Sequence, residues 1–91
     1  MNEELHVTIE GMVQGVGYRH ALRAHASKLG LAGWVCNLPD GRVEARIEGP
    51  REDLEEMLVW CHKGPALSNV TRVDSVWGDA TGNYTGFSIT F

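Results

Sequence analysis

The sequence predicts an α+β fold in which two helices cover one face of an antiparallel sheet. Alternating apolar and polar residues predict strands, apolar residues at spacings of three and four predict two helices, and turns rich in glycine or proline separate them. The segments follow in the order β-α-β-β-α-β, with a short strand at the end. Strands split by two helices, with one tight hairpin between them, favour a ferredoxin-like sandwich.

The first part of the chain supplies a strand, a loop and a helix. Residues 5–9 alternate between apolar and polar side chains, which predicts a half-buried strand that ends at Gly11. A loop with two further glycines follows. Between residues 18 and 29 the apolar side chains are spaced by four, four and three, so they share one face of a helix. Gly30 suits the end of this helix because glycine readily adopts positive φ.

A hairpin occupies the middle of the chain. Residues 34–36 and 43–48 have the composition and alternation of strands. The segment between them, Asn37–Gly41, contains Pro, Asp and Gly in the order that suits a type I turn followed by a left-handed residue. These two strands are therefore expected to pair with each other.

A second helix and two strands complete the chain. We expect Gly49–Pro50 to open the helix with proline in its first turn, where Glu52 and Asp53 complement the helix dipole. Apolar residues within 54–61 then recur at helical spacing, and Lys63–Pro65 ends the helix. The last two predicted strands are Val70–Trp77 and Gly86–Phe91.

Length and composition limit the function. The 91 residues are expected to form one domain, 1–91, and the formal net charge of −4 argues against a general nucleic-acid binder. No apolar run approaches the roughly 20 residues that span a bilayer, so no membrane partner is expected. No basic and apolar leader precedes Leu5, so no secretory signal is indicated and we expect a cytoplasmic protein. We also expect it to be a monomer. In such a protein, Cys36 and Cys61 are expected to be reduced thiols rather than partners in a disulfide.

The charge is distributed unevenly along the chain. From Gly11 to Trp34 there are three cations and no carboxylate, whereas Glu44 to Glu56 contains six acids and two arginines. A protein that is acidic overall but has one cationic segment suits a small anionic ligand better than a polyanion.

The segment Gly11–Arg19 is a candidate anion site. It runs from a strand through a glycine loop into the start of a helix, where unpaired N–H groups and the helix dipole favour negative charge. Arg19 can add a planar fork that binds two phosphate or carboxylate oxygens. The loop is not a P-loop, because no Lys-Ser or Lys-Thr follows the glycines. It is not a dinucleotide fingerprint either, because His20 stands at the third glycine position.

Two motifs resemble the acylphosphatase family. The first is Gly11-x-Val13-Gln14-Gly15-Val16-x-Tyr18-Arg19. The second is Leu29-Gly30-Leu31-x-Gly33-Trp34-Val35-x-Asn37-x-x-Asp40-Gly41-x-Val43-Glu44. The resemblance covers essentially the whole chain, including the closing Gly86-Phe87-Ser88-Ile89.

This resemblance implies a hydrolase that cleaves acyl phosphates to a carboxylate and inorganic phosphate, without metal or cofactor. It implies that Arg19 and Asn37 are the catalytic residues and that Asn37 orients the attacking water. The implied phosphate-binding groups are Arg19 and the backbone N–H groups of Gln14, Gly15, Val16, Gly17, Tyr18 and Arg19. Inorganic phosphate or sulfate is then expected to bind as a product-like ligand.

The residues themselves suit this chemistry. The candidate site has one cation, a set of N–H donors and an amide, but no evident general base or metal-ligand spacing. An acyl phosphate needs little more, because its leaving group is a carboxylate with a pKa of about 4 that departs without an acid. Holding the phosphoryl oxygens and placing a water in line are the tasks that remain.

A binding module without catalysis is the alternative. Ferredoxin-like sandwiches can bind RNA, but that use requires a basic, aromatic third strand, and residues 42–48 contain no aromatic side chain and two acids. A module that senses phosphate or another anion through the same loop stays open at this point.

Overall fold

The computed structural model describes residues 2–90. The elements follow in the order β1 (Asn2–Met12), α1 (Tyr18–Lys28), β2 (Ala32–Asn37), β3 (Val43–Pro50), α2 (Arg51–Lys63), β4 (Asn69–Asp79) and β5 (Phe87–Ile89). This order confirms the predicted ferredoxin-like α+β fold. The predicted last strand extends to Phe91, which lies outside the described residues.

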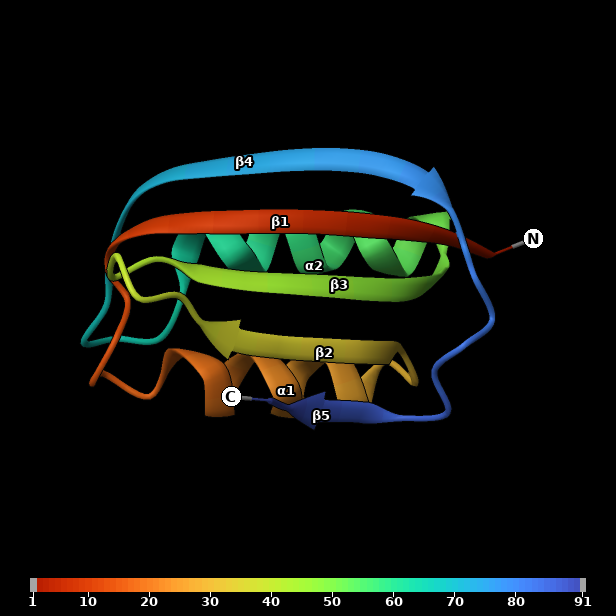
Figure 1. Ribbon diagram of the computed structural model, residues 1–91, viewed down its shortest axis with the longest axis horizontal. Helices are drawn as coiled ribbons and strands as arrows, with labels where there is room; N and C mark the ends of the chain where they lie inside the picture. Colours follow the sequence, from red (N-terminus) through yellow and green to blue (C-terminus); the bar gives the residue numbers. More distant parts are fainter. Residues whose placement is uncertain (1, 91) are drawn as a thin grey trace.

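The five strands form one sheet in the order β4-β1-β3-β2-β5. β2 pairs antiparallel with β3, as the sequence predicts, and β1 pairs antiparallel with both β3 and β4. β5 pairs parallel to β2 at the edge, which makes the sheet mixed. Both helices lie on the same face of the sheet, and the other face has no helix over it (Figure 1).

The core lies between the sheet and the two helices. Alternate residues of the central strands β1 and β3 are completely buried, and each helix contributes one stripe of buried side chains. The buried helix residues are Tyr18, Leu22 and Ala26 on α1 and Leu54, Met57 and Cys61 on α2. The Tyr18 hydroxyl donates a hydrogen bond of 2.8 Å to the Cys61 carbonyl, which ties the first turn of α1 to α2.

Some element boundaries differ from the sequence-based expectation. β1 is longer than residues 5–9 at both ends, because Asn2–Glu4 pair with the end of β3 and pairing with β4 continues through Gly11 and Met12. Pro50 is not in the first turn of α2: it is the last residue of β3 and the N-cap of the helix, with extended backbone angles of −62° and 142°. No helix within residues 2–90 is both long enough and apolar enough to cross a membrane.

The topology places the starts of the two helices at opposite ends of the molecule. β1 and β3 run antiparallel, so the chain leaves the sheet for α1 at one end and for α2 at the other (Figure 1). α1 runs in the opposite direction to β2 and β5. The first turn of α1 therefore lies at the end of the sheet where β2 reaches Asn37.

Candidate functional site

The loop between β1 and α1 is shaped by two glycines. Gly15 has a φ of 75° and Gly17 a φ of 80°, and no residue other than glycine has a positive φ among the described residues. Side chains with a Cβ are strained in this left-handed region. The two glycines therefore let residues 13–17 curl tightly before the helix begins.

The free N–H groups in the first turn of α1 have neither a capping side chain nor a nearby acidic residue within the helix. Gly17 is the N-cap and provides no side-chain hydrogen bond, and no acidic residue lies in the first turn. The first helical hydrogen bond runs from the Ala21 N–H to the Gly17 carbonyl at 3.0 Å. The preceding N–H groups have no intrahelical acceptor, as at any helix start, and attract an anion together with the positive end of the dipole.

Arg19 is the second residue of this helix and is half-buried. Four other arginines form ion pairs with nearby carboxylates, namely Arg42, Arg46, Arg51 and Arg72. Within residues 2–90, Arg19 has no carboxylate within ion-pair distance. The positive charge beside the glycine loop is therefore not neutralised by the described protein groups.

The charge of Arg19 reaches the end of β2. Burial raises the pKa of the Cys36 thiol, and the Glu44 carboxylate raises it further, while a hydrogen bond with Thr90 and the positive charge of Arg19 lower it. The balance leaves that pKa above its usual value. The positive charge of Arg19 is the smallest of these four effects on Cys36.

Asn37 is the last residue of β2, immediately before the hairpin turn. Its Oδ1 atom is buried and has no hydrogen-bond partner among residues 2–90. A buried polar atom without a partner costs about 1–3 kcal/mol. The described fold makes no use of this acceptor, which is the kind of feature that functional sites often retain.

Gln14 connects the glycine loop to the hairpin. Its Nε2 donates hydrogen bonds to the Leu38 carbonyl at 2.8 Å and to the Arg42 carbonyl at 3.0 Å. The sequence-based prediction gave Gln14 only a backbone role in phosphate binding, and it missed this side-chain role. No local pattern could have revealed it, because the two acceptors lie 24 and 28 residues further along the chain.

The structure thus places the candidate site residues of the two motifs at one end of the sheet. Residues 14–17 form the loop, Tyr18 and Arg19 begin α1, and Asn37 ends β2 next to the hairpin that Gln14 holds. Tyr18 is buried, and its hydroxyl is bonded to the Cys61 carbonyl, so its side chain is not available to a ligand. No group of three or more histidine, cysteine and acidic side chains suited to a metal ion occurs among residues 2–90.

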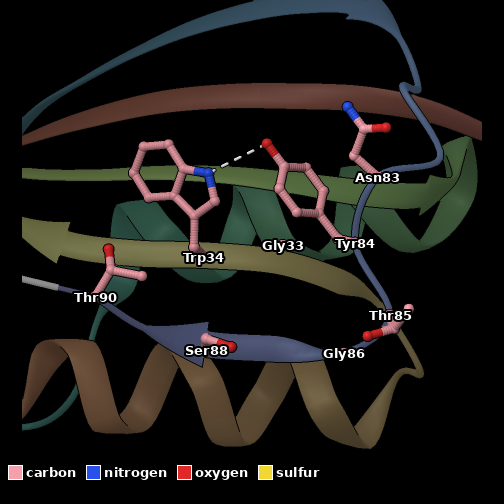
Figure 2. A pocket seen from close by; sticks show the side chains of 8 residues that line it. All are labelled: Gly33, Trp34, Asn83, Tyr84, Thr85, Gly86, Ser88 and Thr90. Atoms are coloured by element: carbon pink, nitrogen blue, oxygen red, sulfur yellow. Dashed lines mark hydrogen bonds between the residues drawn. The ribbon is translucent and has the colours of Figure 1, made fainter.

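A pocket of about 330 Å³ lies elsewhere, on the face of the sheet without helices (Figure 2). It lies between β2 and the segment that leads into β5, and the Trp34 Nε1 donates a hydrogen bond of 3.2 Å to the Tyr84 hydroxyl beside it. Trp34 and Asn37 are three residues apart on one strand, so their side chains leave the sheet on opposite faces. This pocket is therefore separate from the candidate anion site.

A second pocket, of about 440 Å³, is lined by Glu48, Gly49 and Pro50 at the end of β3 and by residues 80–82. It lies at the end of the sheet where α2 begins, away from Arg19. Neither pocket includes any residue of the glycine loop.

Comparisons with known proteins agree with the two motifs. The acylphosphatase family model matches residues 5–89. An acylphosphatase of Roseiflexus sp. is 49% identical over 84 residues, which cover 92% of this chain and 90% of the relative. An acylphosphatase of Thermococcus kodakarensis is 52% identical over 77 residues, or 85% of each chain. The crystal structure of acylphosphatase from Bacillus subtilis superimposes with a TM-score of 0.94 at 35% identity, covering 98% of this chain and 99% of that one. The chain belongs to the acylphosphatase family.

Proposed function

We propose that this acylphosphatase binds the phosphoryl group of its substrate between the glycine loop and Arg19, and that Asn37 orients the attacking water. One observation carries the proposal. The uncapped start of α1 and the unpaired charge of Arg19 lie at the same end of the sheet as Asn37, the last residue of β2.

The backbone N–H groups of residues 14–19 bind the phosphoryl oxygens in this proposal. The left-handed conformations of Gly15 and Gly17 turn successive N–H groups inward, and the helix dipole adds to their attraction for an anion. Arg19 donates two parallel hydrogen bonds to the same group. The donors are arranged before substrate binds, so they stabilise the charge that spreads over the oxygens in the transition state.

The reaction is a displacement at phosphorus. The oxygen of a water molecule, held by the Asn37 amide, attacks the phosphorus in line with the acyl oxygen, and the bond between phosphorus and that oxygen breaks. The bonding electrons leave with the carboxylate, and the proton of the water passes to a phosphate oxygen. The products are the carboxylate and inorganic phosphate.

No protein acid or base is needed for this step. A carboxylate with a pKa of about 4 leaves as the anion, so the leaving oxygen needs no proton. The proposal accordingly assigns neither a metal nor a cofactor. We also propose that inorganic phosphate or sulfate binds in the same loop, and that the protein acts as a cytoplasmic monomer.

The test is hydrolysis of benzoyl phosphate in excess EDTA by the wild type, Arg19→Ala and Arg23→Ala. Arg23 is the matched control, because it lies one turn further along α1, is exposed and is also without an ion-pair partner among the described residues. We expect Arg19→Ala to lower kcat/KM by about 100- to 1000-fold and Arg23→Ala to change it by less than about twofold.

Equal activity of the two variants would contradict the role of Arg19. Turnover that EDTA abolishes would contradict a metal-free mechanism. Phosphate binding by a folded wild type that shows no turnover would favour the anion-sensing alternative.

A further inference from the structure

Two of the exposed large apolar side chains lie in segments at the same end of the molecule as the glycine loop. Within residues 2–90, four large apolar side chains are well exposed: Met12 at 62%, Val59 at 73%, Leu67 at 76% and Val76 at 64%. Met12 immediately precedes the loop, and Leu67 lies in the segment between α2 and β4. Val59 lies within α2, and Val76 lies in the middle of β4, where it pairs with His6 and not with the end of β1.

Met12 and Leu67 are close to each other through the pairing of β1 with β4. The Cα partner of Met12 is Asn69, two residues after Leu67. Paired antiparallel residues have Cα atoms about 5 Å apart, so the Cα atoms of Met12 and Leu67 lie within about 12 Å. The loop after β1 and the loop after α2 lie at the same end of the molecule (Figure 1).

The two segments that carry these side chains have no charge. Residues 11–18 and residues 64–71 contain neither an acidic nor a basic side chain. Arg19 is the nearest cation along the chain to the loop. Under the proposed function, its guanidinium already binds the phosphoryl group. A second anionic group on the substrate would therefore find no charged partner within either segment; Lys63 precedes the second segment, and Arg72, which follows it, is paired with Asp74.

We propose that Met12 and Leu67 contact the acyl group of the bound substrate and favour acyl phosphates whose acyl group is apolar and uncharged. The inference rests on the proposed function, since it takes the phosphoryl group to lie in the glycine loop. An apolar acyl chain that covers these side chains removes apolar surface from water on both partners, which strengthens binding in proportion to the area covered.

The test compares kcat/KM for hexanoyl phosphate and acetyl phosphate. The reactive group is the same in both, and only the length of the apolar chain differs. We expect the wild type to prefer hexanoyl phosphate. The double variant Met12→Gln/Leu67→Gln is expected to lower the hexanoyl-to-acetyl ratio by about tenfold while acetyl phosphate hydrolysis changes by less than about twofold. Both positions are exposed, so neither substitution removes a core contact.

Val76→Thr is the matched control, because it removes a comparably exposed apolar side chain at a site away from the loop. It should leave the hexanoyl-to-acetyl ratio unchanged. An unchanged ratio in the double variant, with acetyl phosphate hydrolysed normally, would overturn the inference and leave the proposed function standing. A wild type that hydrolyses neither substrate would overturn the proposed function, and the inference with it.

Discussion

The first turns of the two helices differ in how their free N–H groups and their arginines are compensated. α2 begins with Arg51, Glu52 and Asp53, so its own acids complement the dipole. Arg51 Nη1 donates a hydrogen bond of 3.0 Å to Glu3 Oε1, and the guanidinium carbon lies 3.6 Å from the centre of the Trp77 ring. α1 begins after a glycine with no acid in its first turn.

Arg19 differs from Arg51 in its place in the helix and in its ion pairing. It lies one position further into its helix, and among residues 2–90 it forms no ion pair. Electrostatic groups that are compensated within the protein stabilise the fold, whereas uncompensated ones remain available to a ligand. The start of α2 therefore has its charges compensated within the protein, whereas the start of α1 has the uncompensated charge that the proposed function assigns to phosphate binding.

Removing the Asn37 amide should give the largest effect among the tests of this comparison. We expect Asn37→Ala to lower kcat by about 100-fold, because the attacking water loses its orientation. The dissociation constant for inorganic phosphate should change by less than about threefold, because Arg19 and the loop are intact. Steady-state kinetics with benzoyl phosphate and calorimetric titration with phosphate measure the two quantities. Equal losses in both would show that Asn37 only supports the loop.

Giving α1 the acidic first turn of α2 should have opposite effects on stability and binding. His20 is exposed and lies in the third position of the helix, so we expect His20→Glu to stabilise the fold by about 0.5 kcal/mol through the dipole. The same carboxylate should weaken phosphate binding by about threefold or more by repulsion. Thermal unfolding measures the expected gain in stability, and phosphate titration measures the expected loss of affinity. His20→Gln is the uncharged control for both. Tighter phosphate binding in His20→Glu would contradict the role of this helix start.

A change at the other end of the sheet should affect stability and leave activity unaltered. Glu48 accepts hydrogen bonds from the Thr81 N–H at 3.0 Å, the Thr81 hydroxyl at 2.8 Å and the Gly82 N–H at 3.1 Å. We expect Glu48→Gln to lower the free energy of unfolding at pH 7 by about 1–2 kcal/mol, since it weakens these bonds. Because Glu48 lies away from Arg19, kcat/KM for benzoyl phosphate should change by less than about twofold.

The effect of Glu48 depends on pH. Burial raises the pKa of its carboxyl, but the hydrogen bonds from Thr81 and Gly82 outweigh burial and leave the pKa below the ordinary glutamate value. A lowered folded-state pKa gives stability that is present above the unfolded-state pKa and is lost as the pH falls through the folded-state pKa. The stability difference between the wild type and Glu48→Gln should therefore narrow below about pH 4. A stability difference between the wild type and Glu48→Gln that stays constant down to pH 2 would contradict the claim that the ionised carboxylate of Glu48 makes these hydrogen bonds.

Local patterns in the sequence predict most of this fold, and the family resemblance names the candidate site. The alternation of Leu5, Val7 and Ile9 and the helical spacing after Tyr18 depend on neighbouring residues, and the structure confirms both. The turn before Gly41 is confirmed as well, since Gly41 has a φ of 96°.

The contacts that the sequence did not predict join distant segments. They include the hydrogen bonds of Gln14 to the hairpin, the contacts of Glu48 with Thr81 and Gly82, and the parallel pairing of β5 with β2. The partners of Glu48 are 33 and 34 residues away, so no local pattern indicates them. The absence of a partner for Asn37 Oδ1 among the described residues depends on tertiary packing, which residue spacing alone does not show.

A phosphate titration followed by amide NMR tests the difference between the two helix starts most directly. If phosphate binds at the start of α1, the backbone N–H signals of residues 14–19 will shift on titration, and those of Glu52, Asp53 and Leu54 will not. The Arg19→Ala variant should show much weaker shifts at the same positions. Shifts of similar size at both helix starts, or no shift in residues 14–19 of the wild type, would contradict the account.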